Sequence, residues 1–385
     1  MHRHSAADPA AARNATPPPG NPQEPAPARL HLLTFFRFLA ALWILVFHLQ
    51  SRLGLHLTGP WLHLAYNGAY AMSFFFVLSG TVLTYGYYTL TASSGDSVRF
   101  YVARFARIYP AYAAIHLLAL PWLGIPFPAA WERWLAVNLA SMFGIQAWFP
   151  PTYVGANTGT WSISCEFFFY ALFPALLPLV RYLAHPARLP RALIYVVLAI
   201  SALGLVDYVF AGEVAFPHYY ISPIMRLPEF ILGMLLGAAL RERSANRPVT
   251  VWPVLASAVA VLLASMNSVY QVGMWARANI IVIPALASLI FWSAAYEQSR
   301  PAVTRGAGRR LPCYLGEISY CFFLAQLPLL MSFDAAVARG SSVARWAVAS
   351  PLTGAGAFLI VVLLLSIALH EAVEKPVRRR LLRAL

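Results

Sequence analysis

The chain has 385 residues, of which 60% are hydrophobic and only 11% are charged. Because soluble globular domains carry about a quarter charged residues, this composition excludes an ordinary soluble protein and indicates an integral membrane protein. The formal net charge of +14 would suit a nucleic-acid partner in a soluble chain, but in a membrane protein the basic loops that set orientation account for it.

The first 30 residues are rich in proline and alanine and contain no apolar run. This composition predicts a disordered cytoplasmic tail over residues 1–30, followed by a single membrane domain over residues 31–385. A secretory signal is not expected, because the first apolar run is long and further spans follow it.

Ten apolar runs of the length needed to cross a bilayer follow the tail. The segment 125–162 is only half apolar, and we expect it to contain an interfacial or re-entrant helix. The expected spans cover approximately residues 32–49, 69–90, 108–124, 163–180, 192–211, 222–240, 251–268, 279–296, 313–333 and 351–370.

The distribution of Lys and Arg predicts the orientation. With the amino terminus in the cytoplasm, 21 of the 28 Lys and Arg residues fall in cytoplasmic segments and five in outer segments. Such a bias is typical of polytopic proteins. We therefore predict an all-α membrane bundle of about ten helices with both termini in the cytoplasm. The two remaining basic residues, Arg37 and Arg226, lie inside spans.

Arg37 and His48 stand in the first span, in the run FFRFLAALWILVFHL. Eleven helical residues advance about 16 Å and return to nearly the same face, so both side chains are expected to face the bundle interior. Taken singly, Arg37 could snorkel toward the inner surface and His48 could lie at the outer interface. Together on one face they favour a functional role.

Glu166 is a carboxylate near the start of the fourth span, in TGTWSISCEFFFYALFP, with Trp161 as the expected interfacial anchor. Such a group needs a partner, most simply His48 or a nearby cation, unless it reaches water at the outer interface. Arg226 and Glu229 lie three residues apart on one helix and are expected to form a structural ion pair.

Arg104 and Arg107 lie in RFYVARFARIYP, which we expect to be a short cytoplasmic loop. Their spacing would let both reach one anionic group. The alternative is ordinary positive charge on the cytoplasmic side.

Several chemistries have no motif in this sequence. It has no Walker loop, no GxGxxG or GxSxG motif, and no HExxH motif, so we expect no metal site. We interpret the three cysteines (Cys165, Cys313 and Cys321) as small apolar residues.

With these elements in order, the chain resembles the acyltransferase-3 family of multispan membrane O-acyltransferases over about residues 31–380. Two positions differ from the family pattern: Thr81 follows the LSG motif where Phe is frequent, and Gln326 stands where a histidine is often found. The motifs that carry the resemblance are FRFLAALWILVFHL, FFFVLSGTVLTYGY, RFARIYP, TWSISCEFFFYALFP, RLPEFILGMLLG, LGEISYCFFLAQLP and VEKPVRRRL.

The resemblance implies a bacterial inner-membrane enzyme that moves an acyl group, acetyl by default, from cytoplasmic acyl-CoA to a hydroxyl of an exported or lipid-linked carbohydrate. It assigns the essential pair to Arg37 and His48, donor binding to Arg104 and Arg107, and the acidic role to Glu166. No permanently bound cofactor is implied.

We expect Arg104 and Arg107 to hold the phosphates of the donor, and Arg37 to orient the donor or stabilise negative charge. His48 would act as general base or accept the acyl group itself, and Glu166 would orient His48 or stabilise its cation. The same intramembrane residues would also suit an ion relay in a transporter or flippase. A structural partner in a polysaccharide assembly complex would need none of them.

Overall fold

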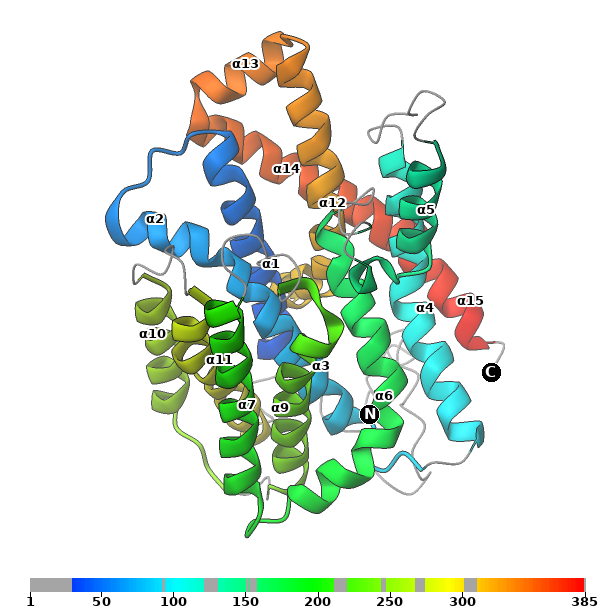
Figure 1. Cartoon of the computed structure of the whole chain (residues 1–385), viewed down its shortest axis with the longest axis vertical. Coiled ribbons are helices and arrows are strands. Elements are labelled where there is room, and N and C mark those ends of the chain that lie inside the picture. The colour runs from blue at the N-terminus through cyan, green and yellow to red at the C-terminus, as the bar shows by residue number, and fades with distance from the viewer. Residues whose placement is uncertain are drawn as a thin grey trace, which may run out of the picture.

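The computed structural model describes residues 30–91, 94–120, 131–149, 152, 158–210, 220–243, 247–266, 274–300 and 310–383. The expected tail lies outside these ranges, apart from its last residue. The described residues form helices and connecting turns with no β-strand (Figure 1). The elements are α1 (His31–Arg52), α2 (Gly59–Tyr66), η2 (Asn67–Tyr70), α3 (Ala71–Gly86), α4 (Ser94–Ala119), α5 (Trp131–Met142), η5 (Gln146–Trp148), η7 (Thr158–Thr160), α6 (Trp161–Leu183), α7 (Leu189–Phe210), α9 (Pro223–Glu242), α10 (Trp252–Met266), α11 (Met274–Gln298), α12 (Arg310–Ala338), α13 (Ser342–Ala349), α14 (Pro351–Leu369), η10 (His370–Glu374, a π-helix) and α15 (Lys375–Arg383).

The all-α polytopic class is confirmed. Among the described residues, eight helices are long and apolar enough to cross a membrane, and they correspond to eight of the ten expected spans. The other two expected spans, residues 108–124 and 251–268, do not correspond to a described helix that is long and apolar enough to cross a membrane. The helix α10 has only 15 residues, fewer than the roughly 20 that a bilayer requires. The helix α4 begins at Ser94, so its first half contains the charged segment expected to be a loop.

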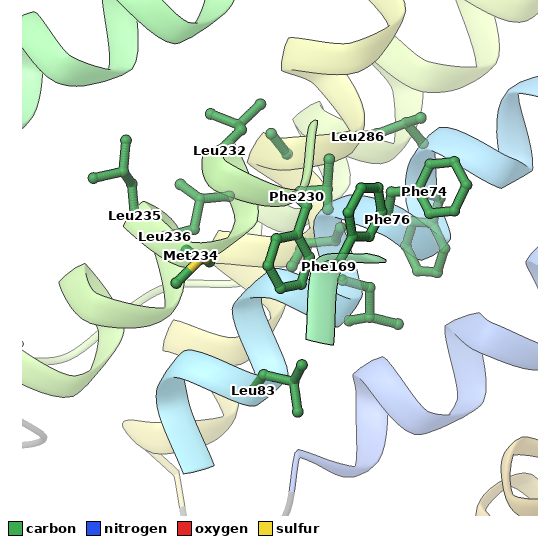
Figure 2. Packing of buried hydrophobic residues seen from close by; sticks show 14 of the residues in the cluster. Phe74, Phe76, Leu83, Phe169, Phe230, Leu232, Met234, Leu235, Leu236 and Leu286 are labelled. Atoms are coloured by element: carbon green, nitrogen blue, oxygen red, sulfur yellow. The ribbon is translucent and has the colours of Figure 1, made fainter. Parts of the chain in front are cut away.

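The helices α3 and α9 pack so closely that glycine is required at their contact. A Cβ atom at Gly233 would collide with the carbonyl oxygen of Val77, and one at Gly80 would collide with the carbonyl oxygen of Phe230. Aromatic rings extend this contact to α6, because Phe169 stacks on Phe230 with ring centroids 4.8 Å apart (Figure 2). This core fixes α6 relative to α9.

The first helix lies between this core and the carboxyl-terminal helices. It packs against α3, α11 and α12. A second close approach joins α1 to α12, where Gly316 lies against the backbone of Thr34. Farther along, α15 and η10 pack along α4 (Figure 1). Residues near the carboxyl-terminal end of the described chain are thereby brought beside α4.

Candidate functional site

Four arginine side chains from three helices interact electrostatically with one another in every pairwise combination. Like charges held together away from bulk water repel one another, so such a group needs counter-charges. Two glutamates supply part of them. We call this group the arginine cluster: Arg37 of α1, Arg104 and Arg107 of α4 and Arg378 of α15, with Glu166 of α6 and Glu374 of η10.

Arg37 faces the protein interior and interacts with Glu166 across the α1–α6 gap. The Tyr170 hydroxyl, one turn farther along α6, donates a hydrogen bond of 3.1 Å to Glu166 Oε2. Glu166 also interacts with Arg104 and Arg107. The predicted partner of Glu166 was His48 or a nearby cation, and the structure places it with the cations.

The packing of the first turn of α6 explains why Glu166 can interact with Arg37. Trp161, expected at the membrane interface, is instead buried and packs against Phe76 and Tyr220. The side chain of Gln146 holds this first turn: its Nε2 donates to the carbonyl oxygen of Thr160 at 2.8 Å, and its Oε1 accepts from Ser164 Oγ at 3.0 Å. A satisfied polar network of this kind fixes one position of the helix.

Arg107 pairs with Glu374, and this partner was not anticipated from the sequence. Arg107 lies inside α4, not in a loop, and its guanidinium contacts Glu374 Oε1. The other carboxylate oxygen, Oε2, lies 3.0 Å from His370 Nδ1 and 3.2 Å from Cys321 Sγ. The π-helix η10 sets this arrangement, since an inserted residue changes which side chains face inward.

Cys321, His370 and Glu374 have the donor types and proximity of a metal site. Their ligand atoms lie within 4.8 Å of one another, and all three residues are buried. A divalent cation there would stand beside Arg107, whose guanidinium already holds Glu374, and Arg378 also interacts electrostatically with His370. The local charge therefore favours a hydrogen-bonded chain over a bound cation.

Arg104 is held by Tyr87 but keeps one donor free. Its Nη2 donates to the Tyr87 hydroxyl at 3.1 Å, and its guanidinium carbon lies 5.3 Å from the centre of that ring. Its Nε is buried and has no hydrogen-bond partner within the described ranges.

His48 lies at the opposite end of α1 from the arginine cluster. Its charged neighbour is Arg52, which forms an ion pair of 3.1 Å with Asp334. The expected contact between Glu166 and His48 is not seen among the described residues, where Glu166 interacts with Arg37, Arg104 and Arg107. Within the part of the chain that the structure describes, neither ring nitrogen of His48 is hydrogen bonded, and the imidazole lies beside the Phe47 ring with centroids 5.1 Å apart.

Two further polar residues have structural roles. The expected Arg226–Glu229 pair is confirmed at 2.6 Å, and both side chains are buried. Arg226 also donates to the carbonyl oxygen of Tyr220 at 2.8 Å. Gln326 is buried and donates to the carbonyl oxygen of Ala41 at 2.9 Å, which ties α12 to α1 about one turn beyond Arg37.

Four residues of this region were not identified from the sequence: Cys321, His370, Glu374 and Arg378. Glu374 and Arg378 lie in VEKPVRRRL, which contributed to the resemblance but received no role, and Cys321 was interpreted as an apolar residue. One signal was present, since His370 and Glu374 are four residues apart and so share a helix face at the end of an apolar run.

Two comparisons with known proteins point to acyl transfer. A family model described as an acyltransferase domain matches residues 30–371. The chain is also similar to the protein named Acyltransferase MdmB from Streptomyces mycarofaciens, with 30% identity over 384 residues, which cover 93% of this chain and 94% of that protein. No solved structure matches.

Proposed function

The chain belongs to the acyltransferase-3 family, and from this premise we propose that it transfers an acyl group, acetyl by default, from cytoplasmic acyl-CoA to a hydroxyl group. The proposed acceptor is an exported or lipid-linked carbohydrate, and the proposed site of action is the bacterial inner membrane. The multi-pass helical architecture supports a reaction that begins on one membrane face and ends on the other.

The observation that carries the proposal is the division of α1 into two chemically different ends. At one end, Arg37 belongs to a cluster in which the arginines outnumber the two carboxylates. Guanidinium groups bind phosphate strongly and with fixed geometry, so this end suits the phosphates of CoA. At the other end, about 16 Å along the helix, the imidazole of His48 makes no hydrogen bond within the described residues. An extended pantetheine arm could join the two.

His48 is proposed to act as the general base. It removes the proton from the acceptor hydroxyl as the hydroxyl oxygen attacks the thioester carbonyl. The carbon–sulfur bond then breaks, and the CoA thiolate takes up a proton. The imidazole ring can accept a proton at one nitrogen and return it, which suits this exchange. In the alternative sequence, His48 attacks the thioester first and passes the acyl group to the hydroxyl.

Arg37 is proposed to orient the donor, and Glu166 to hold Arg37 in place. The Tyr170 hydrogen bond limits the positions open to the Glu166 carboxylate. Because Glu166 compensates part of the arginine charge without contacting His48, its proposed role is at the donor end and not in the proton transfer.

The experiment is mass spectrometry of exported polysaccharides and lipid-linked glycans from wild-type, deletion and His48→Ala strains. We expect loss of an ester-linked acyl mass in both mutant strains. The matched control is His56→Asn, because His56 is exposed near the same end and Asn tolerates its positive φ of 48°. If the deletion removes the mass while His48→Ala retains it, the enzyme remains and the role of His48 is wrong.

A further inference from the structure

The two arginines assigned to donor binding by the sequence differ in the structure. Arg107 forms an ion pair with Glu374 Oε1. The other carboxylate oxygen, Oε2, contacts His370 and Cys321. A phosphate that took Arg107 would leave a buried carboxylate without its cation, which is unfavourable. Arg107 is therefore poorly placed to exchange its partner for a ligand.

Arg378 differs from Arg107 in having no ion-pair partner within the described residues. It lies on α15, which packs along α4 (Figure 1). Its side chain is partly exposed and makes no hydrogen bond or ion pair within the described ranges, although it interacts electrostatically with Arg104 and Arg107. A nearby carboxylate, Glu317, is exposed to solvent and partly balances it.

Arg104 supplies a second donor beside Arg378. Its buried Nε lacks a hydrogen-bond partner among the described residues, and a buried donor without an acceptor is costly unless a ligand satisfies it. Tyr87 holds its guanidinium from one side and interacts electrostatically with Arg378. Two guanidinium groups that repel each other in the free protein would gain from a shared anion.

We propose that Arg104 and Arg378 together bind a phosphate group of the donor, while the Arg107–Glu374 pair positions α4 against η10 and keeps the two ligand arginines in place. This inference rests on the proposed function, because it names the phosphate-binding residues for the same donor. It moves one of the two donor contacts from α4 to the carboxyl-terminal helix α15.

The test is equilibrium binding of CoA and of dephospho-CoA to the purified full-length protein in nanodiscs of neutral lipid. The variants are Arg378→Gln and Arg104→Gln, and the matched control is Arg380→Gln, an exposed arginine on the same helix. Loss of one charge-assisted contact is expected to weaken CoA binding at least about tenfold in each ligand variant. The control should bind as the wild type does.

Dephospho-CoA identifies which phosphate is bound. If Arg378→Gln weakens CoA binding but not dephospho-CoA binding, the ligand is the 3′-phosphate. If it weakens both, the ligand is the diphosphate. Either result supports the proposal. Unchanged CoA affinity in Arg378→Gln, with a folded protein, overturns it while leaving the proposed function intact.

Two further binding measurements distinguish failure of this inference from failure of the proposed function. If wild-type protein binds no CoA but binds pyrophosphate in an Arg378-dependent manner, the anion site stands and the CoA donor is wrong. If Arg378→Gln leaves CoA binding intact but abolishes retention of phosphatidylglycerol from mixed nanodiscs, the cluster binds a lipid headgroup, and the assignment of Arg378 to the donor is overturned.

Discussion

Glu374 is a buried residue that supplies the counter-charge for Arg107. Glu374→Gln keeps the size of the side chain but removes its charge, so Arg107 loses its counter-charge in a partly buried site. Breaking a buried ion pair costs about 3–5 kcal/mol, and we expect a clear fall in the midpoint of thermal unfolding in detergent. Glu371→Gln is the matched control, because Glu371 pairs with Lys375 on the surface, where such pairs contribute less than about 1 kcal/mol. Equal shifts would contradict the assignment.

Substitutions of Arg37 test whether donor binding depends on the positive charge or on the planar shape of the guanidinium group. Arg37→Gln is expected to raise the KM for acyl-CoA at least about tenfold, because one charge-assisted contact is lost. Arg37→Lys should recover part of this loss, since it restores the charge but not the planar guanidinium. The measurement is steady-state kinetics with acyl-CoA as the varied substrate. Wild-type KM in both variants would show that Arg37 does not contact the donor.

At the level of helices, the α3–α9 contact is the most sensitive to side-chain size. Gly233→Ala places a methyl group against the carbonyl of Val77, so one helix must move. Overpacking of a tight contact costs about 1–3 kcal/mol, and a lower thermal midpoint is expected. Gly356→Ala in α14 is the control, because nothing lies within 4 Å of its added Cβ. If both variants keep the wild-type midpoint, the close packing is not required.

Helix class and most spans could be predicted from the sequence because apolar length is a local property. The errors come from longer-range effects. The charged segment at Arg104 and Arg107 was expected to be a loop, but α4 includes it, since Tyr87 and Glu374 provide partners for these arginines. Trp161 was expected at the interface, but the buried Gln146 network draws the start of α6 inward.

The candidate site was only partly predictable for the same reason. Arg37 and Glu166 were each identified as intramembrane charges, and the structure brings them together. The pairing of Arg107 with Glu374 joins residues far apart in the sequence, and no local pattern encodes it. The position of Glu166 among the arginines depends on how α6 packs against its neighbours, which apolar periodicity does not determine.

For the whole molecule, the charge distribution predicts that both termini lie in the cytoplasm. Alkaline phosphatase is active only outside the inner membrane, so fusions report the side of each segment. A fusion after Arg383 should be inactive, and one inserted at Gly340, in the turn between α12 and α13, should be active. The reverse pattern would place the arginine cluster on the outer side, away from cytoplasmic acyl-CoA.

In the proposed mechanism, the donor binds at one end of α1 and His48 catalyses the transfer at the other end. This mechanism is tested most directly by measuring donor binding and turnover separately in His48→Ala. Purified protein is supplied with acetyl-CoA and an acceptor extract, and release of free CoA is followed beside equilibrium binding of CoA. We expect turnover to fall by about 10²–10⁴-fold, as for loss of a general base, with CoA affinity unchanged, because the arginine cluster lies at the other end of the helix. Wild-type turnover in His48→Ala would contradict the catalytic role of this residue.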